Sequence, residues 1–206
     1  MIGGNGFLGS SVVEGLLADG HRVRVLDRSP ARPDVDWGRV DYRIGGLDDR
    51  ATLQAVLEGV DCVYHLASST VPGTSNQDPA FDVGSNLVGA LNLIAEMADA
   101  GVRRIVFFSS GGTVYGNPER IPVDEAHPLR PISSYGVVKV AIENYLSMYQ
   151  RLGQLDPLIL RPSNPYGPRQ STSGIQGAVA AFLGRALNGE GVQIWGDGEV
   201  VRDYIY

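Results

Sequence analysis

The fold of this chain is decided by its first nine residues, a glycine-rich stretch that reads Met1-Ile2-Gly3-Gly4-Asn5-Gly6-Phe7-Leu8-Gly9. A helical pattern with an apolar face follows from Ser10 to Asp19. Glycines at 3, 6 and 9 allow a tight turn, a close approach to a ligand and close packing of the helix on a sheet. The free N–H groups at the start of such a helix bind phosphate. The stretch therefore predicts a phosphate-binding turn.

The next predicted strand strengthens this interpretation. Residues 22–26 alternate between polar and apolar and end in Asp27, an acid at the distance expected for a partner of a ribose diol. The alternative is that Asp27 is an ordinary turn residue. An acid here favours NAD over NADP, because a 2′-phosphate would meet a like charge. Arg28, the next residue, weakens that preference.

Strands and helices alternate along the rest of the chain. Further strands are predicted at 40–44, 62–67, 103–108 and 157–160, and helices at 50–57, 79–100 and from 135 to about 152. Gly101 is expected to end the second of these helices. Alternation at this spacing predicts an α/β fold with a parallel, doubly wound sheet. Ligands of such sheets bind at the carboxyl ends of the strands.

Composition limits the possible functions. The chain has 206 residues, is 43% hydrophobic and contains 27 glycines, so it can form one globular domain with part of a second. A net charge of −6 without a basic run argues against a nucleic-acid partner. The single cysteine, Cys62, fits a reducing compartment, and its strand-like surroundings indicate a core residue. Without a long apolar run or a signal-peptide pattern, we expect a cytoplasmic protein with no membrane partner.

Residues 133–139 hold the pair with the clearest chemical meaning. Tyr135 and Lys139 lie four residues apart, which places an ammonium beside a phenol on one helix face. Lowering a tyrosine pKa from about 10 to near 7 takes about 4 kcal/mol, which this ammonium and a cationic cofactor ring could supply. The alternative is a surface lysine on an amphipathic helix. However, Lys139 is the only lysine among 17 lysines and arginines, which indicates that a compact ammonium is required here.

Taken together, the motifs resemble the NAD-dependent epimerase/dehydratase family of extended short-chain dehydrogenases/reductases. The resemblance runs from end to end of the chain and implies a Rossmann-type fold. The matching motifs are the glycine stretch at 3–9, His65-Leu66-Ala67-Ser68, Asn86-Leu87-Val88-Gly89, Ser109-Ser110-Gly111-Gly112-Thr113-Val114-Tyr115-Gly116, the pair Tyr135 and Lys139, Leu160-Arg161-Pro162-Ser163-Asn164-Pro165-Tyr166-Gly167-Pro168, and residues 196–204.

The resemblance also implies roles for the matching residues. The catalytic group would consist of Tyr135 and Lys139 with Ser110 and Thr113. NAD would be held by Gly3, Gly6, Phe7, Leu8, Gly9, Asp27, Arg28, Leu47, Leu66, Ala67, Ser68, Asn86, Ser109, Tyr135, Lys139 and Pro162. The sugar nucleotide would be held by Asn164 and Arg202. Without the family, Asn164 is interpreted as a loop residue between prolines and Arg202 as a solvated charge. No metal site is implied.

Three features depart from the family pattern. Gly111 stands where the family usually has a Ser or Thr that bonds the reacting sugar hydroxyl, so that role is either vacant or passes to Ser110, Thr113 or a water. Gly46 replaces an acid that commonly contacts adenine. We also expect truncation at both ends, because only Met1 and Ile2 precede the glycine turn and the chain stops inside a motif. Residues 1–160 would then form the NAD-binding domain and residues 161–206 the incomplete start of a substrate-binding lobe.

The function implied by the resemblance is that of an NAD-dependent nucleotide-sugar epimerase, acting at C4 of a UDP-hexose by transient hydride transfer to bound NAD. Dehydration is disfavoured, because Gly112 and Thr113 stand where dehydratases carry an acid pair. A reductase and a non-catalytic dinucleotide-binding protein stay open. The family also implies a homodimer through the two long helices, with an apolar stripe of Leu87, Leu91, Ile94 and Ala98 on the first of them. The alternative is that this stripe packs only on its own sheet.

Overall fold

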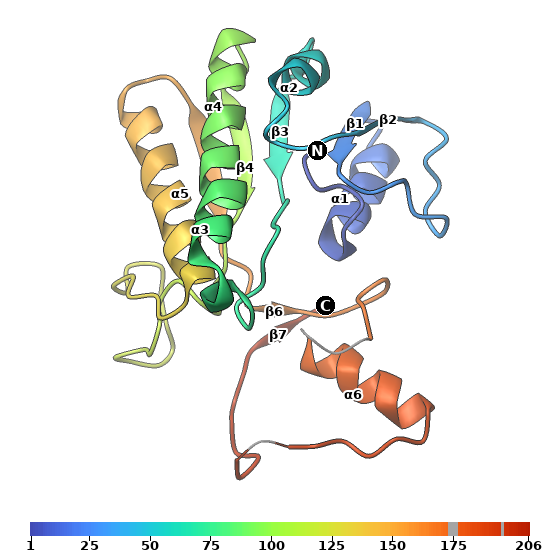
Figure 1. Cartoon of the computed structure of the whole chain (residues 1–206), viewed down its shortest axis with the longest axis vertical. Helices are drawn as coiled ribbons and strands as arrows, with labels where there is room; N and C mark the ends of the chain where they lie inside the picture. Colours follow the sequence, from blue (N-terminus) through green and yellow to red (C-terminus); the bar gives the residue numbers. More distant parts are fainter. Residues whose placement is uncertain (173–176, 195) are drawn as a thin grey trace.

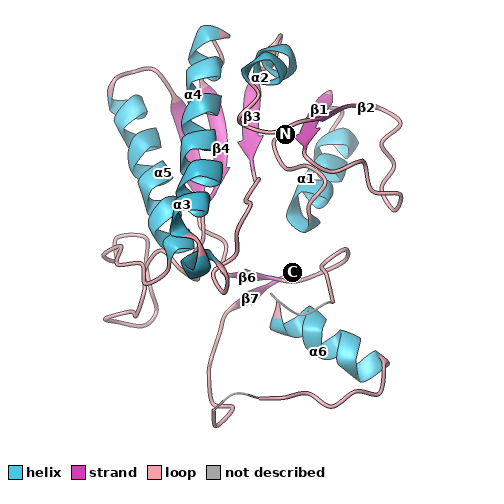
Figure 2. Ribbon diagram, viewed as in Figure 1, coloured by secondary structure: helices cyan, strands magenta, loops and turns pink. Residues whose placement is uncertain are grey.

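The computed structural model describes residues 1–172, 177–194 and 196–206. It consists of a parallel sheet with helices on both faces and a smaller unit beyond the carboxyl ends of the strands (Figure 1, Figure 2). The elements are, in order, α1 (Phe7–Ala18), β1 (Val23–Asp27), β2 (Val40–Ile44), α2 (Arg50–Leu57), β3 (Cys62–His65), the 3₁₀ turn η1 (Ser75–Gln77), α3 (Pro79–Asp82), the π-helical segment η2 (Val83–Val88), α4 (Gly89–Asp99), β4 (Arg104–Phe108), α5 (Ser134–Arg151), β5 (Asp156–Leu160), β6 (Asn164–Pro165), α6 (Ala178–Leu187) and β7 (Tyr204–Ile205).

The main sheet is parallel throughout, and the segment 1–3 joins its two halves. β2 pairs with β1, and β3, β4 and β5 pair in that order. Ile2 bridges both Leu26 of β1 and His65 of β3, and its N–H donates to the Tyr64 carbonyl at 2.8 Å. The sheet order is therefore β2, β1, Ile2, β3, β4, β5. The predicted α/β doubly wound Rossmann-type fold is confirmed, and Ile2 holds the sheet position of the strand that was expected before the glycine turn.

Helices cover the two faces of the sheet unequally. One hydrophobic cluster joins α2, α4 and α5 to β1, β3 and β4, with Leu93 and Phe107 fully buried at its centre. The other face carries α1, whose Val13 packs against Val23 and Val25 of β1. Alternate residues of one strand thus point into different clusters, as a sheet with helices on both faces requires.

The local patterns predicted most elements closely. Residues 40–44 and 50–57 form β2 and α2 as expected, and Gly101 ends α4 with a φ of 72°. The helix expected over 79–100 is continuous but contains the π-helical segment η2. α1 begins at Phe7 rather than Ser10, because the extended Gly6 is already the residue that precedes the helix. β3 ends at His65, since the N–H groups of Leu66 and Ala67 both donate to the carbonyl of Ile2.

Three of the four residues of the apolar stripe expected on the first long helix point inward, and the fourth, Ala98, is exposed. Ile94 is buried, and Leu87 and Leu91 pack against the main hydrophobic cluster. The alternative interpretation, packing on the chain's own sheet, therefore holds for these three residues. Cys62 is half-buried on β3, and burial raises the pKa of its thiol. In the part of the chain that the structure describes, no helix is long and apolar enough to span a membrane.

The smaller unit lies beyond the carboxyl ends of the strands, where β6 and β7 run beside each other and α6 lies below them (Figure 1). β6 pairs in parallel with β7, so that Asn164 faces Tyr204 across the pair. The ring of Tyr166 packs edge-on against Tyr204 and Tyr206. This unit begins only a few residues after β5, and it faces the edge of the sheet where ligands are expected.

Candidate active site

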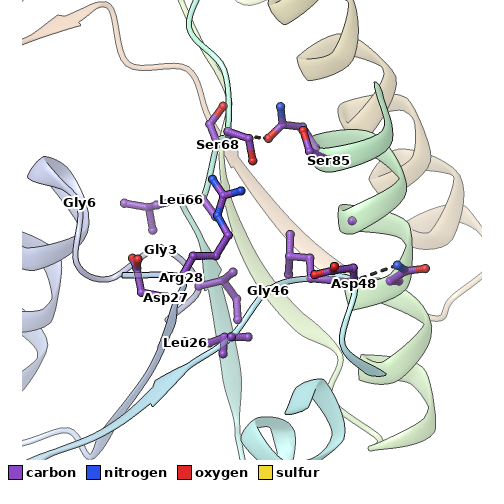
Figure 3. Close-up of a pocket in the computed structure, with 18 of the residues that line it drawn as sticks. Gly3, Gly6, Leu26, Asp27, Arg28, Gly46, Asp48, Leu66, Ser68 and Ser85 are labelled. Atoms are coloured by element: carbon purple, nitrogen blue, oxygen red, sulfur yellow. Dashed lines mark hydrogen bonds between the residues drawn. The ribbon is translucent and has the colours of Figure 1, made fainter. Parts of the chain in front are cut away.

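A cavity of about 690 Å³ opens at the carboxyl ends of β1, β2 and β3 (Figure 3). Nine residues that the sequence predicted as cofactor ligands line it: Gly3, Gly6, Asp27, Arg28, Leu47, Leu66, Ala67, Ser68 and Asn86. Figure 3 shows the side chain of Arg28 extending across the cavity toward Ser68. The cavity thus lies between the glycine turn and the carboxyl ends of β1, β2 and β3.

Two glycines of the turn are required by close backbone contacts. Gly3 has a φ of 81°, and a Cβ there would lie 2.6 Å from the backbone nitrogen of Ala67. A Cβ on Gly9 would lie 2.2 Å from the Gly3 carbonyl oxygen. Gly6 is different, because its nearest neighbour would be 3.5 Å away and it lines the cavity. These contacts pack α1 tightly against the turn while leaving Gly6 open to a ligand.

The start of α1 is suited to an anion. Gly6 precedes the helix, and no side chain of the described residues caps its first N–H groups, which belong to Phe7 and Leu8. Uncapped N–H groups at a helix start favour a phosphate, both as donors and through the helix dipole. Phe7, Leu8 and Gly9 lie behind Gly6 and do not themselves line the cavity.

Asp27 is oriented by the backbone around it. Its Oδ2 accepts a hydrogen bond from the N–H of Asn5 at 3.0 Å, and its Oδ1 accepts one from the N–H of Ser29 at 3.0 Å. Each carboxylate oxygen has a second lone pair, so the group can still accept from a diol. Asn5 lines the cavity as well, and its Oδ1 accepts from the N–H of Arg32. Apart from its place between glycines, no sequence pattern indicated a role for Asn5.

Asp48 is a cavity residue that sequence reasoning missed. A Cβ on Gly46 would lie only 2.3 Å from Oδ1 of Asp48, so this carboxylate occupies the space beside the position where the family pattern has an acid. The loop is held on α4 by the Nδ2 of Asn92, which donates to the Leu47 carbonyl at 3.1 Å. The signal for Asp48 was present, since an acid follows Gly46 by two residues. Only the turn geometry brings it into the cavity.

The structure brings Tyr135 and Lys139 together at the start of α5. The hydroxyl of Ser133 caps this helix by accepting from the N–H of Gly136, and the N–H of Tyr135 donates to the Ser75 hydroxyl at 3.1 Å. Nζ of Lys139 lies 5.5 Å from the centroid of the Tyr135 ring and donates to the Phe108 carbonyl at 2.8 Å. Both side chains lie beside the end of β4, outside the lining of the cavity.

The electrostatics of this pair differ from the expectation. Burial, and then the carboxylate of Asp82, raise the pKa of Tyr135 to about 12. Burial lowers the pKa of Lys139 to about 8, although Asp82 and Glu143 act in the opposite direction. The expected lowering of the Tyr135 pKa by its neighbouring ammonium is therefore wrong for the chain alone. Desolvation of the phenolate and a nearby carboxylate outweigh that ammonium.

Asp82 is a fully buried carboxylate that joins three segments. Its Oδ1 accepts from the Thr70 hydroxyl at 2.7 Å and from Nδ2 of Asn86 at 2.8 Å. Its Oδ2 accepts from the Ser134 hydroxyl at 2.6 Å. Asn86 in turn accepts from the N–H of Ser69 at 2.8 Å. Asn86, predicted to bind the cofactor, lines the cavity but uses its amide in this internal network.

The loop after β4 explains the glycine at position 111. The N–H of Gly111 donates to the Pro162 carbonyl at 2.8 Å, and a Cβ at this position would lie 2.6 Å from the Arg161 carbonyl oxygen. A serine therefore does not fit without movement of one of these segments. Of the alternatives, Ser110 is half-buried, and the Oγ1 of Thr113 is buried without a hydrogen-bond partner among the described residues.

The remaining predicted residues lie outside the cavity. Ser109 is buried and donates its hydroxyl proton to Oε1 of Glu143. The carbonyl of Pro162 accepts the hydrogen bond from the N–H of Gly111 in the loop after β4. Asn164 uses its Nδ2 to donate to the Asp203 carbonyl at 2.8 Å, which ties β6 to the chain before β7. Arg202 is exposed and donates to the carbonyl of its neighbour Val201.

His65 is a buried titratable residue for which the sequence suggested no role of its own. It is 2% exposed, lies 5.5 Å from the Phe107 ring, and its Nδ1 has no partner among the described residues. Burial, with the charge of Lys139, lowers the pKa of His65 to about 3. The imidazole is therefore neutral at physiological pH, and it does not compete with Lys139 as a cation.

Comparisons with known proteins show similarity along the whole chain. The model of the NAD dependent epimerase/dehydratase family matches residues 1–206. A UDP-glucose 4-epimerase of Mycolicibacterium smegmatis is 39% identical over 99% of this chain and 67% of its own length. The crystal structure of UDP-glucose 4-epimerase with UDP-glucose from Thermotoga maritima has a TM-score of 0.94 at 37% identity, covering 100% of this chain and 68% of the other. The Thermus thermophilus UDP-glucose 4-epimerase complex with NAD has a TM-score of 0.90 at 38% identity, covering 100% of this chain and 69% of the other.

Proposed function

This chain belongs to the NAD-dependent epimerase/dehydratase family, and on that premise we propose that it is an NAD-dependent nucleotide-sugar epimerase that inverts C4 of a UDP-hexose. The chain spans about two thirds of the length of the relatives described above, one of which is a solved complex with UDP-glucose. The observation that carries the proposal is the position of Tyr135 and Lys139 at the strand ends, next to a cavity lined by the glycine turn and Asp27.

The residues around the cavity fit NAD. The uncapped start of α1 suits a pyrophosphate, and the oriented carboxylate of Asp27 suits a ribose diol. The close contacts of Gly3 and Gly9 leave no room for side chains in this turn, whereas Gly6 is open to the cavity. When bound, NAD supplies the site that accepts and returns the sugar's hydride. The family is NAD-dependent.

Tyr135 would take the proton from the sugar hydroxyl at its Oη and return it later. With a pKa of about 12, the phenol is protonated in the chain alone at neutral pH. We expect binding of the cationic cofactor to lower this pKa. Proton transfer by Tyr135 would then occur only in the protein with NAD bound. Lys139 is held by the Phe108 carbonyl and would contribute an ammonium close to the developing phenolate.

We assign the hydroxyl that orients the sugar to Thr113. Gly111 has no room for a side chain, because the Arg161 carbonyl oxygen fills that space. Thr113 lies two residues further along the same turn, and its Oγ1 is the buried hydroxyl oxygen there without a partner among the described residues. A substrate hydroxyl would satisfy it. Ser110 stays the alternative, and Asn164 and Arg202 keep their proposed role toward the sugar nucleotide.

Two features argue against other activities. Neither Gly112 nor Thr113 can act as the acid or base that dehydration needs at the neighbouring carbons. A non-catalytic dinucleotide-binding protein would have no reason to bury Lys139, since burial of an ammonium costs several kcal/mol unless it is compensated.

The test is made on purified protein. We expect denaturation to release NAD, and the intact protein to interconvert UDP-glucose and UDP-galactose without added cofactor. Variant T113V should lower kcat, while S110A should affect it less. Bound NAD without turnover of any UDP-hexose would contradict the substrate assignment, and the absence of nucleotide would contradict a tightly held cofactor.

We further propose that residues 1–160 form the NAD-binding domain and residues 161–206 the start of the substrate-binding lobe, and that the protein forms a homodimer through its two long helices. The large apolar side chains that these helices expose are Phe81, Val83, Val88, Val137, Tyr145 and Met148, with Leu152 at the end of α5. Their α5 members recur at helical spacing and form one stripe. Substitution M148E should yield a monomer in light-scattering measurements, whereas an unchanged mass would contradict this interface.

A further inference from the structure

An ion pair between the buried Glu143 and the partly buried Arg161 lies one helical turn beyond Lys139. Glu143 follows Lys139 by one turn of α5 and is 3% exposed. Its Oε2 accepts from Nη2 of Arg161 at 2.6 Å, and its Oε1 accepts from Nε of Arg161 at 3.0 Å. This is the two-bond geometry that a guanidinium forms best with a carboxylate. Arg161 is the first residue after β5.

The pair holds the loop that carries Ser110 and Thr113. Oε1 of Glu143 also accepts the hydroxyl proton of Ser109, while Lys139 donates to the carbonyl of Phe108. Two successive turns of α5 therefore hold two successive residues at the end of β4. Arg161 adds contacts from the other side, because its Nη1 donates to the Tyr115 hydroxyl at 3.0 Å and its carbonyl lies against Gly111.

Stability alone does not account for this arrangement. Buried ion pairs contribute little net stability compared with well-packed apolar side chains, because both charges must be desolvated. The contacts of Glu143 instead join α5, which carries Tyr135 and Lys139, to the loop after β4, which carries Ser110 and Thr113. Arg161 also donates to the Glu125 carbonyl at 3.3 Å, which ties a third segment to the pair.

Resting on the proposed function, we propose that Glu143, held in place by Arg161, is a positioning residue that keeps Lys139 as an ammonium and fixes the loop of Ser110 and Thr113 toward the substrate. The ionisable groups that face Lys139 are Tyr135 and Glu143 on α5, Asp82 on α3 and His65 on β3. His65 is neutral, so Glu143 and Asp82 are the anions that favour the ammonium. Removal of the Glu143 charge should then shift the Lys139 titration and the alkaline limb of activity to lower pH.

The single lysine makes this titration directly measurable. Protein labelled with ¹³C at lysine Cε gives one lysine signal, which belongs to Lys139. In the parent protein we expect a midpoint at about pH 8. E143Q keeps the size of the side chain and an acceptor for Ser109 but removes the charge. We expect its midpoint to fall by about half a pH unit or more, and kcat to fall by about 100-fold with a much smaller change in KM.

A second variant separates positioning from stability. E143Q leaves the partly buried Arg161 without its carboxylate partner and should lower the Tm. The double variant E143Q/R161Q removes that unpaired charge and should recover Tm, but neither kcat nor the Lys139 midpoint. D156N breaks the exposed pair between Asp156 and Arg103 at the other end of β5 and should leave all three quantities unchanged.

Two results would overturn the inference. One is an E143Q variant with the parental Lys139 midpoint and alkaline limb. The other is a double variant in which kcat recovers together with Tm, because the pair would then act only through stability. The lysine titration needs no substrate, so it still decides on Glu143 if the parent protein turns over no UDP-hexose and the proposed function fails.

Discussion

The cavity around the glycine turn and the region around Tyr135 lie at the same edge of the sheet but are built differently. The glycine turn is built from backbone, with Gly9 so close to Gly3 that a Cβ would lie 2.2 Å from its carbonyl oxygen. The Tyr135 region is built from buried charges, with Asp82, Lys139 and Glu143 all at most 5% exposed. We therefore expect substitutions in the glycine turn to change packing and cofactor binding. Substitutions around Tyr135 should chiefly change kcat and its pH dependence.

The largest effect that this comparison predicts is in the charged region. Y135F removes the proton-transfer group, so we expect kcat to fall by about 10³-fold or more with the protein still folded and loaded with NAD. Steady-state kinetics and the nucleotide content of denatured protein check this. Y145F alters an exposed tyrosine on the same helix that does not line the cavity, so kcat and nucleotide content should be unchanged. A Y135F variant that had lost its nucleotide would contradict the separation of the two regions.

Substitutions in the glycine turn should instead lower the stability of the protein and weaken NAD binding. In G9A the new Cβ meets the Gly3 carbonyl, so we expect a loss of about 3 kcal/mol in the free energy of unfolding together with weaker NAD binding. Urea unfolding and NAD titration measure both. The matched control is G15A in the same helix, where no atom lies within 4 Å of the new Cβ and alanine should stabilise slightly. Equal stability of the two variants would refute the contact.

Gly111 shares a feature with each region: its backbone is closely packed, and its nearest neighbour is the carbonyl of Arg161, which belongs to the ion pair with Glu143. The family pattern would suggest that G111S restores a catalytic hydroxyl. The structure predicts the opposite, because the Cβ would lie 2.6 Å from the Arg161 carbonyl oxygen and would push the ion pair of Glu143 out of place. We expect a loss of about 2 kcal/mol in stability and a lower kcat. G112S, whose Cβ has 4.0 Å to its nearest neighbour, is the control for stability. Higher activity of G111S would show that the loop adapts.

The smallest effect concerns the stability cost of the buried ammonium. The pKa of Lys139 is about 8 in the fold, against 10.5 for a lysine side chain in water, so its desolvation destabilises the protein fully below pH 8, and the penalty fades between pH 8 and 10.5. K139M should therefore be inactive but more stable by about 1 to 2 kcal/mol at pH 7. Chemical unfolding at pH 7 and pH 10 measures the gain. A stability gain of K139M that was larger at pH 10 than at pH 7 would contradict this prediction.

Local patterns predicted the scaffold well because their causes are local. α2 begins at Arg50 because the side chain of Asp49 accepts from the N–H of Thr52, a cap that is visible in the sequence. The network of Asp82 could not be predicted in this way, since its partner Ser134 lies 52 residues away. The same holds for Glu143 and Arg161. The raised pKa of Tyr135 depends on burial and on Asp82, neither of which the spacing of tyrosine and lysine reveals.

The bridging role of Ile2 has a consequence for folding cooperativity. In the sheet, β1 and β2 connect to β3, β4 and β5 through the short segment 1–3. Met1 and Gly3 make its backbone hydrogen bonds to β1, and Ile2 makes those to β3. We therefore expect two units of different opening free energy in native-state hydrogen exchange. Amides of β4, enclosed by strands on both sides, should exchange last, and those of β1 and β2 earlier. The unit that binds the adenosine end would then be the one that opens first.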